Sequence, residues 1–291
     1  MNLVQHLKDE IERKQRRIVV CGDAMTDRWV HGRVLECQDG CPKFIGHQDI
    51  VETPGGAANA ANSLSCWNIV TSLRSCSPHD YPIKTRYVDH DGRIVFRTDS
   101  EYPVLRDWDD DLELALEQVR KADAVLLSDY DKGFLTPDLI AAVIGLCKER
   151  GTPCVADAKR GAELYAGAVV KGNKDWHLKH RCDGPKVITL GSTAPGVMEE
   201  GSHLLVAIGR CIGLPPVECI NHVGAGDCFV AHLTLALTYG FSLEDAAALA
   251  HSAGRVYVQF PHNRPPKPEE IEEDLSKCGS GLSSSMIGPI R

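Results

Sequence analysis

The sequence predicts an α/β fold in which a mainly parallel sheet lies between two layers of helices, a three-layer αβα sandwich with a small β-sheet lid. Short runs that are apolar throughout recur along the chain, as expected of strands covered on both faces. Helical patterns lie between these runs, so strands and helices alternate. The predicted strands are residues 17–22, 123–129, 153–157 and 186–191.

The helices are predicted from the signals at their ends. Segment 108–121 opens with three aspartates, which suit the positive end of a helix dipole. Segment 137–150 has Thr136 as N-cap, a proline in its first turn and Gly151 at its end. Residues 228–239 are apolar with helical periodicity, which predicts a buried helix.

Two segments depart from this alternation and predict the lid. Residues 30–52 and 83–99 contain short alternating runs, and the second includes a His-Asp-Gly turn typical of a hairpin. We expect both to form a small antiparallel sheet outside the main one. The predicted domain therefore covers residues 1–275, and the Gly/Ser-rich residues 276–291 are expected to form a flexible tail.

Composition excludes several classes of protein. The chain has 291 residues, 43% of them hydrophobic, and a formal net charge of −8, which argues against a nucleic-acid surface. No run approaches 18 apolar residues and the N-terminus lacks the apolar core of a signal peptide, so we expect no membrane span and a cytoplasmic location. The twelve cysteines include no C-x-x-C pair, which favours reduced thiols over a disulfide framework or a metal site.

The strongest chemical signal is Gly224-Ala225-Gly226-Asp227 at the start of the last predicted helix. Small residues let a ligand approach the backbone, and the free N–H groups of a helix start attract an anion. A carboxylate beside such an anion site suits phosphoryl transfer from a nucleotide to a hydroxyl. The same motif could instead be a packed helix start, with Asp227 facing the helix dipole.

Two further motifs carry small or acidic residues at sites suited to a polyol. Gly55 and Gly56 precede an Ala-rich helix, where Asn59 could offer an amide to hydroxyl groups. Asp23 follows the first strand, and ligands of open α/β sheets bind beyond the carboxyl ends of strands. A tightly packed helix and an acidic surface turn are the alternative interpretations.

Together these motifs resemble the ribokinase-like (PfkB) carbohydrate kinase family, from about residue 17 to residue 261. Within the family, residues 22–28, 54–59, 127–133 and 157–159 resemble the bacterial heptose 7-phosphate kinases.

The resemblance implies a ribokinase-like fold and ATP-dependent phosphorylation of a hydroxyl on a small sugar or sugar phosphate, a heptose 7-phosphate among the candidates. It also implies Mg²⁺ carried by the ATP phosphates without a direct protein ligand, and a homodimer through the lid. By this resemblance Asp227 is the catalytic base and Gly224, Ala225 and Gly226 form the anion hole. Substrate would be held by Asp23, Gly55, Gly56, Asn59, Lys84, Arg86 and Arg97, and the nucleotide by Asn173, Thr189 and Gly191.

Three departures from the family pattern leave a second interpretation open. Asn221 stands where the family usually has aspartate, and Trp176 stands where an Asn-x-x-Glu motif starting at Asn173 would place glutamate. The chain is also short between residues 63 and 83 and between residues 173 and 186. A catalytically silent ribokinase-like protein that binds a sugar phosphate or nucleotide, as a sensor or assembly partner, is therefore the alternative. The intact Gly-Ala-Gly-Asp motif favours the kinase.

Overall fold

The structure is a computed structural model. It describes residues 2–35, 43–76, 81–101, 108–180, 184–191, 193–198, 206–207, 211 and 214–277. In chain order its elements are α1 (Leu3–Arg13), β1 (Arg17–Gly22), β2 (Ala24–Leu35), β3 (Lys43–Gly56), α2 (Ala57–Ser63), β4 (Val70–Arg74), β5 (Ile83–Val88), β6 (Ile94–Ser100), α3 (Trp108–Arg120), β7 (Ala124–Ser128), α4 (Pro137–Arg150), β8 (Cys154–Asp157), the short 3₁₀ helix η2 (Ala162–Tyr165), β9 (Val169–Asn173), α5 (Lys174–Lys179), β10 (Lys186–Leu190), β11 (Thr193–Met198), β12 (Val206–Ala207), α6 (Ala225–Thr238), α7 (Leu243–Tyr257) and α8 (Pro268–Ser276).

The main sheet is mostly parallel. Within the described residues it has eight strands in the order β12-β11-β10-β9-β8-β7-β1-β4. Every pairing from β4 to β10 is parallel, whereas β10–β11 and β11–β12 are antiparallel. The carboxyl ends of β1, β7, β8 and β9 therefore meet at one edge of the sheet.

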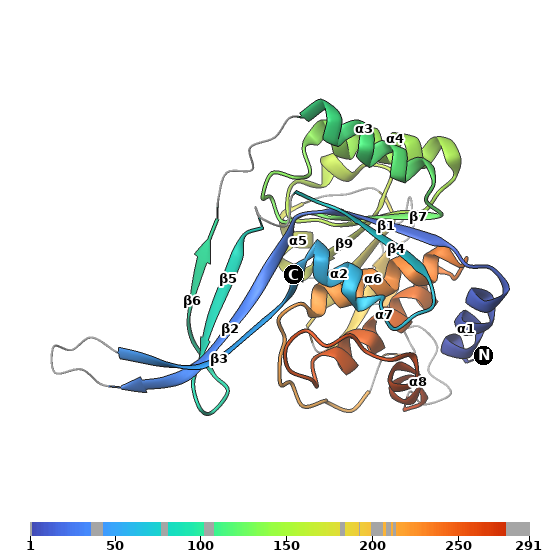
Figure 1. Cartoon of the computed structure of the whole chain (residues 1–291). Helices are drawn as coiled ribbons and strands as arrows, with labels where there is room; N and C mark the ends of the chain where they lie inside the picture. The colour runs from blue at the N-terminus through green and yellow to red at the C-terminus, as the bar shows by residue number, and fades with distance from the viewer. Residues whose placement is uncertain are drawn as a thin grey trace.

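Helices cover both faces of this sheet. Alternate residues of β1 enter different hydrophobic clusters, Ile18 and Val20 the one with α2, α6 and α7, Val19 and Cys21 the one with α4. Figure 1 shows α3 and α4 on one side of the sheet and α2, α6 and α7 on the other. The predicted three-layer αβα architecture is confirmed, and the uninterrupted apolar strands follow from burial on both faces.

The predicted elements occur close to their expected bounds. The four predicted strands correspond to β1, β7, β8 and β10, and the helices to α3, α4 and α6. Thr136 caps α4 by accepting a hydrogen bond from the N–H of Leu139 at 3.2 Å, and Gly151 ends it with a φ of 61°. Helix α6 starts at Ala225, three residues before the predicted start, so Asp227 lies in its first turn.

The small sheet differs from its prediction in extent and direction. Its order is β3-β2-β5-β6, and the β2–β5 pairing is parallel, so the sheet is mixed rather than antiparallel. It also begins at Ala24 and includes Gly56, outside the predicted segment 30–52. The extension was missed because Asp27 takes a buried position in the alternation between Met25 and Trp29, where an apolar residue is expected. In Figure 1 this sheet projects from one side of the main body.

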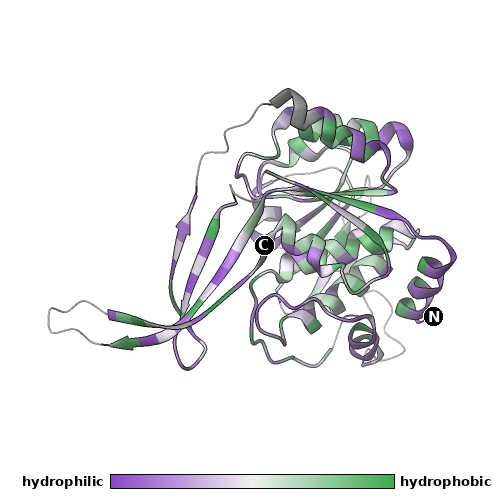
Figure 2. Cartoon of the chain, in the orientation of Figure 1, coloured by the Kyte–Doolittle hydropathy of each residue, from purple (hydrophilic) through white to green (hydrophobic). Residues whose placement is uncertain are grey.

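Hydropathy follows the layers. Figure 2 shows apolar residues along α6 and mixed polar and apolar residues along the strands of the small sheet. In the part of the chain that the structure describes, no helix combines the length and the apolar character that a membrane span needs. Of the predicted tail, Ser276 ends α8, and residues 278–291 lie outside the described residues.

Candidate active site

The N-terminus of α6 is shaped by Gly224. This residue caps the helix with a φ of 83°, in the left-handed region that favours glycine. A Cβ at this position would overlap Asn59 Nδ2 and the Tyr257 hydroxyl. The backbone therefore turns into α6 in contact with two side chains that support the site, and only glycine fits.

Asp227 is buried at this helix start, with 2% of its surface exposed. Its Oδ2 accepts a hydrogen bond from Asn59 Nδ2 at 3.0 Å, and its Oδ1 accepts one from the Tyr130 hydroxyl. Burial raises the pKa of Asp227 to about 6, although both hydrogen bonds favour the charged form and oppose that shift. A carboxylate with this pKa is ionised at neutral pH and basic enough to accept a proton from a hydroxyl.

Asn59 has a different role from the predicted one. The structure buries it completely, and its Nδ2 also lies 3.1 Å from the Tyr257 hydroxyl and 3.3 Å from the Gly224 carbonyl oxygen. These contacts use the amide to orient Asp227. These donors face the helix start and not open space, so the geometry gives no support to the predicted contact of Asn59 with a polyol.

Lys171 adds a buried cation that the sequence analysis did not single out. It is 5% exposed, and its Nζ lies 3.0 Å from Asp157 Oδ1. A Cβ on Gly226 would lie 3.0 Å from the same Nζ, so the ammonium group lies against the N-terminus of α6. A positive helix end and a lysine at one point favour an anion. In the sequence, this buried cation is indicated only by a lysine among the apolar residues of its strand.

The backbone of the predicted anion hole is partly available. The Ala225 N–H donates to the His222 carbonyl oxygen at 3.3 Å, a long bond at the helix start. The N–H of Gly226 lies in the first turn of α6, where no intrahelical acceptor exists for it. Anion contact at this end therefore rests mainly on Gly226 together with Lys171.

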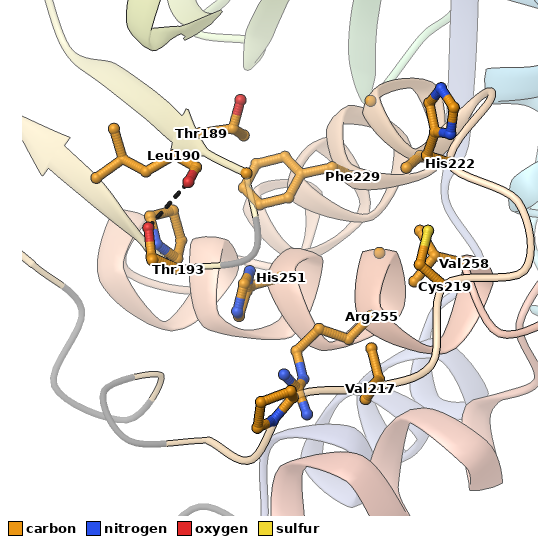
Figure 3. A pocket seen from close by; sticks show the side chains of 16 residues that line it. Thr189, Leu190, Thr193, Val217, Cys219, His222, Phe229, His251, Arg255 and Val258 are labelled. Carbon is orange, nitrogen blue, oxygen red and sulfur yellow. Dashed lines mark hydrogen bonds between the residues drawn. The ribbon is translucent and has the colours of Figure 1, made fainter.

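A cavity of about 370 Å³ adjoins this helix start, and it lies between the ends of β10 and β11 and the helices α6 and α7. It has the size of a small-ligand pocket. Thr189 and Gly191, which were predicted to contact the nucleotide, line it, and so do Ala225 and Gly226 of the motif. Figure 3 shows Phe229 and Leu190 lining the interior, with His251 and Arg255 presented from α7. The lining is mostly apolar, which suits a planar base.

His251 and Arg255 add polar groups to that cavity. Burial, reinforced by the charge of Arg255, lowers the pKa of His251 to about 4, so its imidazole is neutral at pH 7. The Arg255 guanidinium donates to Asp274 of α8 and to the Pro215 carbonyl oxygen, which holds the cavity wall in place.

Asn173 does not line this cavity, and its contact with the nucleotide stays a prediction. Its Oδ1 accepts a hydrogen bond from the Trp176 N–H at 2.8 Å and so caps α5. Trp176 is buried, and its Nε1 donates to the Arg160 carbonyl oxygen at 2.8 Å. The tryptophan at the expected glutamate position therefore anchors the loop after β8 and offers no metal ligand.

A second, polar cavity of about 420 Å³ lies beside Lys171 and Asp157. One oxygen of Asp157, Oδ2, is buried and has no hydrogen-bond partner among the described residues. Among those residues no cluster of three or more His, Cys, Asp or Glu side chains could hold a metal by itself. The remaining lining side chains include Lys159, Asn173, Asp175, Trp176, Lys179 and His180.

Asp23 does not face the acceptor space as predicted. Its carboxylate accepts backbone N–H bonds from Tyr130, Lys132 and Phe134 at 2.8 to 3.2 Å. Burial raises the pKa of Asp23, and these three hydrogen bonds oppose the rise. The side chain therefore holds the loop after β7, and the geometry gives no support to the predicted contact of Asp23 with hydroxyl groups.

The acidic residue beside the glycine pair is Asp27. A Cβ on Gly55 would lie 2.8 Å from Asp27 Oδ2, so this carboxylate, and not Asp23, adjoins the predicted sugar-binding segment. Gly56 is required for its φ of 55°. Asp27 is buried, and it accepts hydrogen bonds from Arg86 NH1 at 2.6 Å and from Asn263 Nδ2 at 3.0 Å.

The three predicted phosphate-binding cations lie in different settings. Arg86 is buried in its ion pair with Asp27, so the geometry gives no support to its predicted contact with substrate. Arg97 is exposed on β6 and pairs with Asp99 at 2.8 Å, and its contact with substrate stays a prediction. Lys84 of β5 lies at the site, with its Nζ 5.3 Å from the centre of the Tyr130 ring.

Asn221 organises the loop that precedes α6. Its Oδ1 accepts from the Val223 N–H at 3.0 Å, and its Nδ2 lies 3.3 Å from Asn263 Oδ1. Asn263 also bonds Asp27, so this amide connects the helix start to the small sheet. A neutral residue serves this structural role.

Comparisons with known proteins agree with this architecture. A family model described as "pfkB family carbohydrate kinase" matches residues 177–270. The chain is 27% identical to "Bifunctional protein HldE" of Gluconobacter oxydans over an alignment of 311 residues, which covers 89% of the chain and 64% of that protein. It is 29% identical to "Bifunctional protein HldE" of Azorhizobium caulinodans, with 83% and 60% covered. The chain thus spans less than two thirds of the length of these two relatives.

Solved structures show the same fold at low sequence identity. A putative ribokinase from Agrobacterium tumefaciens has a TM-score of 0.69 at 16% identity and covers 91% of this chain and 98% of its own. Arabidopsis thaliana ribokinase complexed with ribose and ATP has a TM-score of 0.60 at 17% identity, with 90% and 99% covered. The predicted ribokinase-like fold and the resemblance to the PfkB carbohydrate kinase family, a family of ATP-dependent sugar kinases, are confirmed.

Proposed function

We propose that this chain is an ATP-dependent kinase that phosphorylates a hydroxyl of a small sugar or sugar phosphate. The observation that carries the proposal is the buried Asp227 at the N-terminus of α6, beside the Lys171 ammonium group. A base and an anion site at one point are what phosphoryl transfer to a hydroxyl needs.

The cavity between α6, α7 and β10 would hold the nucleotide. Its apolar lining suits the base, and Gly226 lies where the cavity meets the helix start. The triphosphate would then extend along the N-terminus of α6 toward Lys171. In this arrangement Thr189, Gly191, Ala225 and Gly226 contact the nucleotide, and Gly224 shapes the turn that presents them.

The transfer step is an in-line displacement. The acceptor hydroxyl gives its proton to Asp227 while its oxygen forms a bond to the γ-phosphorus. The bond between the γ-phosphorus and the bridging oxygen breaks, and its electron pair leaves with ADP. The Lys171 ammonium group and the helix N-terminus stabilise the charge on the phosphoryl oxygens.

Mg²⁺ fits this site as an ion carried by the nucleotide. It would neutralise charge on the phosphates, with the unpartnered Oδ2 of Asp157 and the carboxylate of Asp175 available in the adjoining polar cavity. Neither Trp176 nor Asn173, whose Oδ1 caps α5, offers a free ligand oxygen in its side chain.

The acceptor would lie at the end of the small sheet that meets α2, where the glycine pair ends β3. Asp27 and Gly55 border this space, Gly56 turns the backbone toward α2, and Lys84 supplies a cation. A sugar phosphate suits this mixture of carboxylate and ammonium groups. The likeness of segments 22–28 and 127–133 to heptose 7-phosphate kinases makes a heptose 7-phosphate the first candidate.

We also propose a homodimer through the small sheet. Six apolar side chains of this sheet are 38 to 55% exposed: Val34, Leu35, Ile50, Ile94, Val95 and Phe96. Exposed apolar groups gathered on one element are typical of an association surface. Light scattering should give twice the chain mass for the wild type and the single mass for Val95→Glu; a monomeric wild type would contradict the dimer.

The division into a kinase domain of residues 1–275 and a tail stays a prediction. Helix α8 packs against α7 and α1, which supports a domain that extends to this helix.

The deciding experiment is a coupled ADP-release assay with ATP and Mg²⁺ against a panel of acceptors. The panel contains a heptose 7-phosphate, fructose 6-phosphate, ribose 5-phosphate and the unphosphorylated sugars. Acceptor-dependent release is expected, and Asp227→Asn should reduce it about 10²- to 10⁴-fold because the base is lost. Asp138→Asn is the matched control, since Asp138 is also a first-turn aspartate, in α4, but exposed.

Two results would redirect the assignment. An Asp227→Asn variant with full activity would remove Asp227 as the base. Silence across the panel, with nucleotide or sugar phosphate still bound, would favour a non-catalytic sensor or assembly partner.

A further inference from the structure

Tyr130 is hydrogen-bonded to the carboxylate that an acceptor hydroxyl has to reach. Its hydroxyl donates to Asp227 Oδ1, and Asn59 already donates to Oδ2. An acceptor hydroxyl has to donate to the same carboxylate before it can attack. The base is therefore already hydrogen-bonded on both oxygens before a substrate arrives.

The loop that carries Tyr130 is fixed, whereas its side chain is only partly buried. Asp23 accepts the N–H of Tyr130 at 2.8 Å, and also those of Lys132 and Phe134. Asp131 of the same loop has a φ of 56° and is bonded through its N–H to Asp129. Release of Asp227 therefore requires rotation of the Tyr130 side chain and not movement of its backbone.

Two lysines lie over the Tyr130 ring. Lys84 Nζ of the small sheet lies 5.3 Å from the ring centre, and Lys159 Nζ of the loop after β8 lies 4.9 Å from it. Neither ammonium group forms a salt bridge with any residue that the structure describes. A cation over an aromatic face is attracted to it, but a phosphate group binds an ammonium group more strongly.

We propose that Tyr130 shields Asp227 until an anionic acceptor binds Lys84 and Lys159, so that the site selects phosphorylated sugars over neutral sugars and water. The inference rests on the proposed kinase function and names the acceptor class of the same site. A neutral sugar hydroxyl has to compete with the Tyr130 hydroxyl for Asp227, and no charged contact favours it. The phosphate of a sugar phosphate engages both lysines, removes them from the ring and offsets that loss.

The same contact limits loss of ATP. In hydrolysis, a water oxygen would form the bond to the γ-phosphorus, its proton would pass to Asp227, and ADP would leave. Water carries no anionic group for the lysines, so it cannot release Tyr130 in this way.

The test compares wild type with Tyr130→Phe, which keeps the ring and removes the hydroxyl. We measure kcat/KM for ribose 5-phosphate against ribose, for fructose 6-phosphate against fructose, and ATP hydrolysis without acceptor. A hydrogen bond to a charged group predicts that the preference for the phosphorylated sugar falls about tenfold or more and that acceptor-free hydrolysis rises by a similar factor. An unchanged preference would overturn the proposal. Tyr165→Phe is the control, because its hydroxyl also donates to a buried carboxylate, Asp129, at 2.5 Å.

A pH profile separates this role from a structural one. Because the Tyr130 hydrogen bond lowers the pKa of Asp227, its removal should move the acid limb of the rate profile to higher pH. Tyr165→Phe should leave the limb in place. An acid limb that does not move in Tyr130→Phe would count against the contact in solution.

A binding measurement keeps the inference separate from turnover. Calorimetry should show that inorganic phosphate binds wild type and binds Lys159→Ala more weakly. Because Lys159 is exposed, this substitution carries little risk to folding. Ribose should bind Tyr130→Phe more tightly than wild type. If these shifts occur without any turnover, the kinase function fails and the acceptor selection stands. If wild type binds no phosphate, or ribose binds both proteins equally, the selection fails even where turnover is present.

Discussion

The N-terminus of α6 and the small sheet contribute to one site but are built differently. At the helix start, Asp227 has both carboxylate oxygens bonded, and Asn59 is held by three partners. On the small sheet, Arg86 is buried in an ion pair and Arg97 is exposed in another, which leaves Lys84 over Tyr130. The groups proposed for catalysis are thus held by burial and hydrogen bonds, whereas the small sheet offers recognition a lysine, Lys84, that forms no salt bridge within the described residues.

The largest effect is expected at the N-terminus of α6, and it tests whether the buried charges there stabilise the fold. Lys171→Met leaves Asp157 charged, buried and unpaired, which should cost about 3–5 kcal/mol of unfolding free energy in urea titrations. Adding Asp157→Asn should restore much of that stability without restoring ADP release, since the ammonium group remains absent. The control is Lys148→Met, at an exposed lysine near the end of α4. If Lys171→Met were as stable and as active as wild type, the buried ion pair would not distinguish the helix start from the small sheet.

A smaller effect is expected from the helix start itself. Gly224→Ala imposes the left-handed backbone cost of about 1–2 kcal/mol and adds overlap with Asn59 and Tyr257. Gly240→Ala is the matched change, because its φ of 80° is similar and no atom lies within 4 Å of the added Cβ. Urea unfolding should show Gly224→Ala as the less stable of the two; equal stabilities would mean that the helix start is not tightly packed.

The smallest effect distinguishes the cations of the small sheet. Lys84→Ala should raise KM for a sugar phosphate about tenfold, the worth of one charge-assisted hydrogen bond. Arg97→Ala should change it less than about twofold, because Arg97 is exposed and already paired with Asp99. Steady-state kinetics on both variants checks this ranking. Equal effects would place Arg97 at the acceptor after all.

Much of the fold could be predicted because its signals are local. The apolar strands, the Thr136 cap and the Gly-Ala-Gly-Asp helix start each depend on neighbouring residues. The small sheet was predicted only in part, since Asp27 interrupts the alternation of β2.

The site was predicted less completely, because its contacts join distant segments. Asn59 and Asp227 are 168 positions apart, and Tyr130 and Asp227 are 97 apart. The sequence pattern placed Asp23 at a strand end but could not show that three backbone N–H groups take up its carboxylate. The proposed role of Lys171 in anion binding becomes evident only when β9 lies beside α6, because nothing in the sequence of its own strand indicates an anion.

The central claim, that Asp227 is the base, is tested most directly by the pH dependence of acceptor-dependent ADP release. Because burial raises the pKa of Asp227 to about 6, the carboxylate is protonated below that pH and ionised above it. A base acts only when ionised, so kcat/KM should rise about tenfold per pH unit below pH 6 and level off above about pH 7. A profile that is flat between pH 5 and pH 8, or that falls as pH rises through 6, would contradict Asp227 as the base.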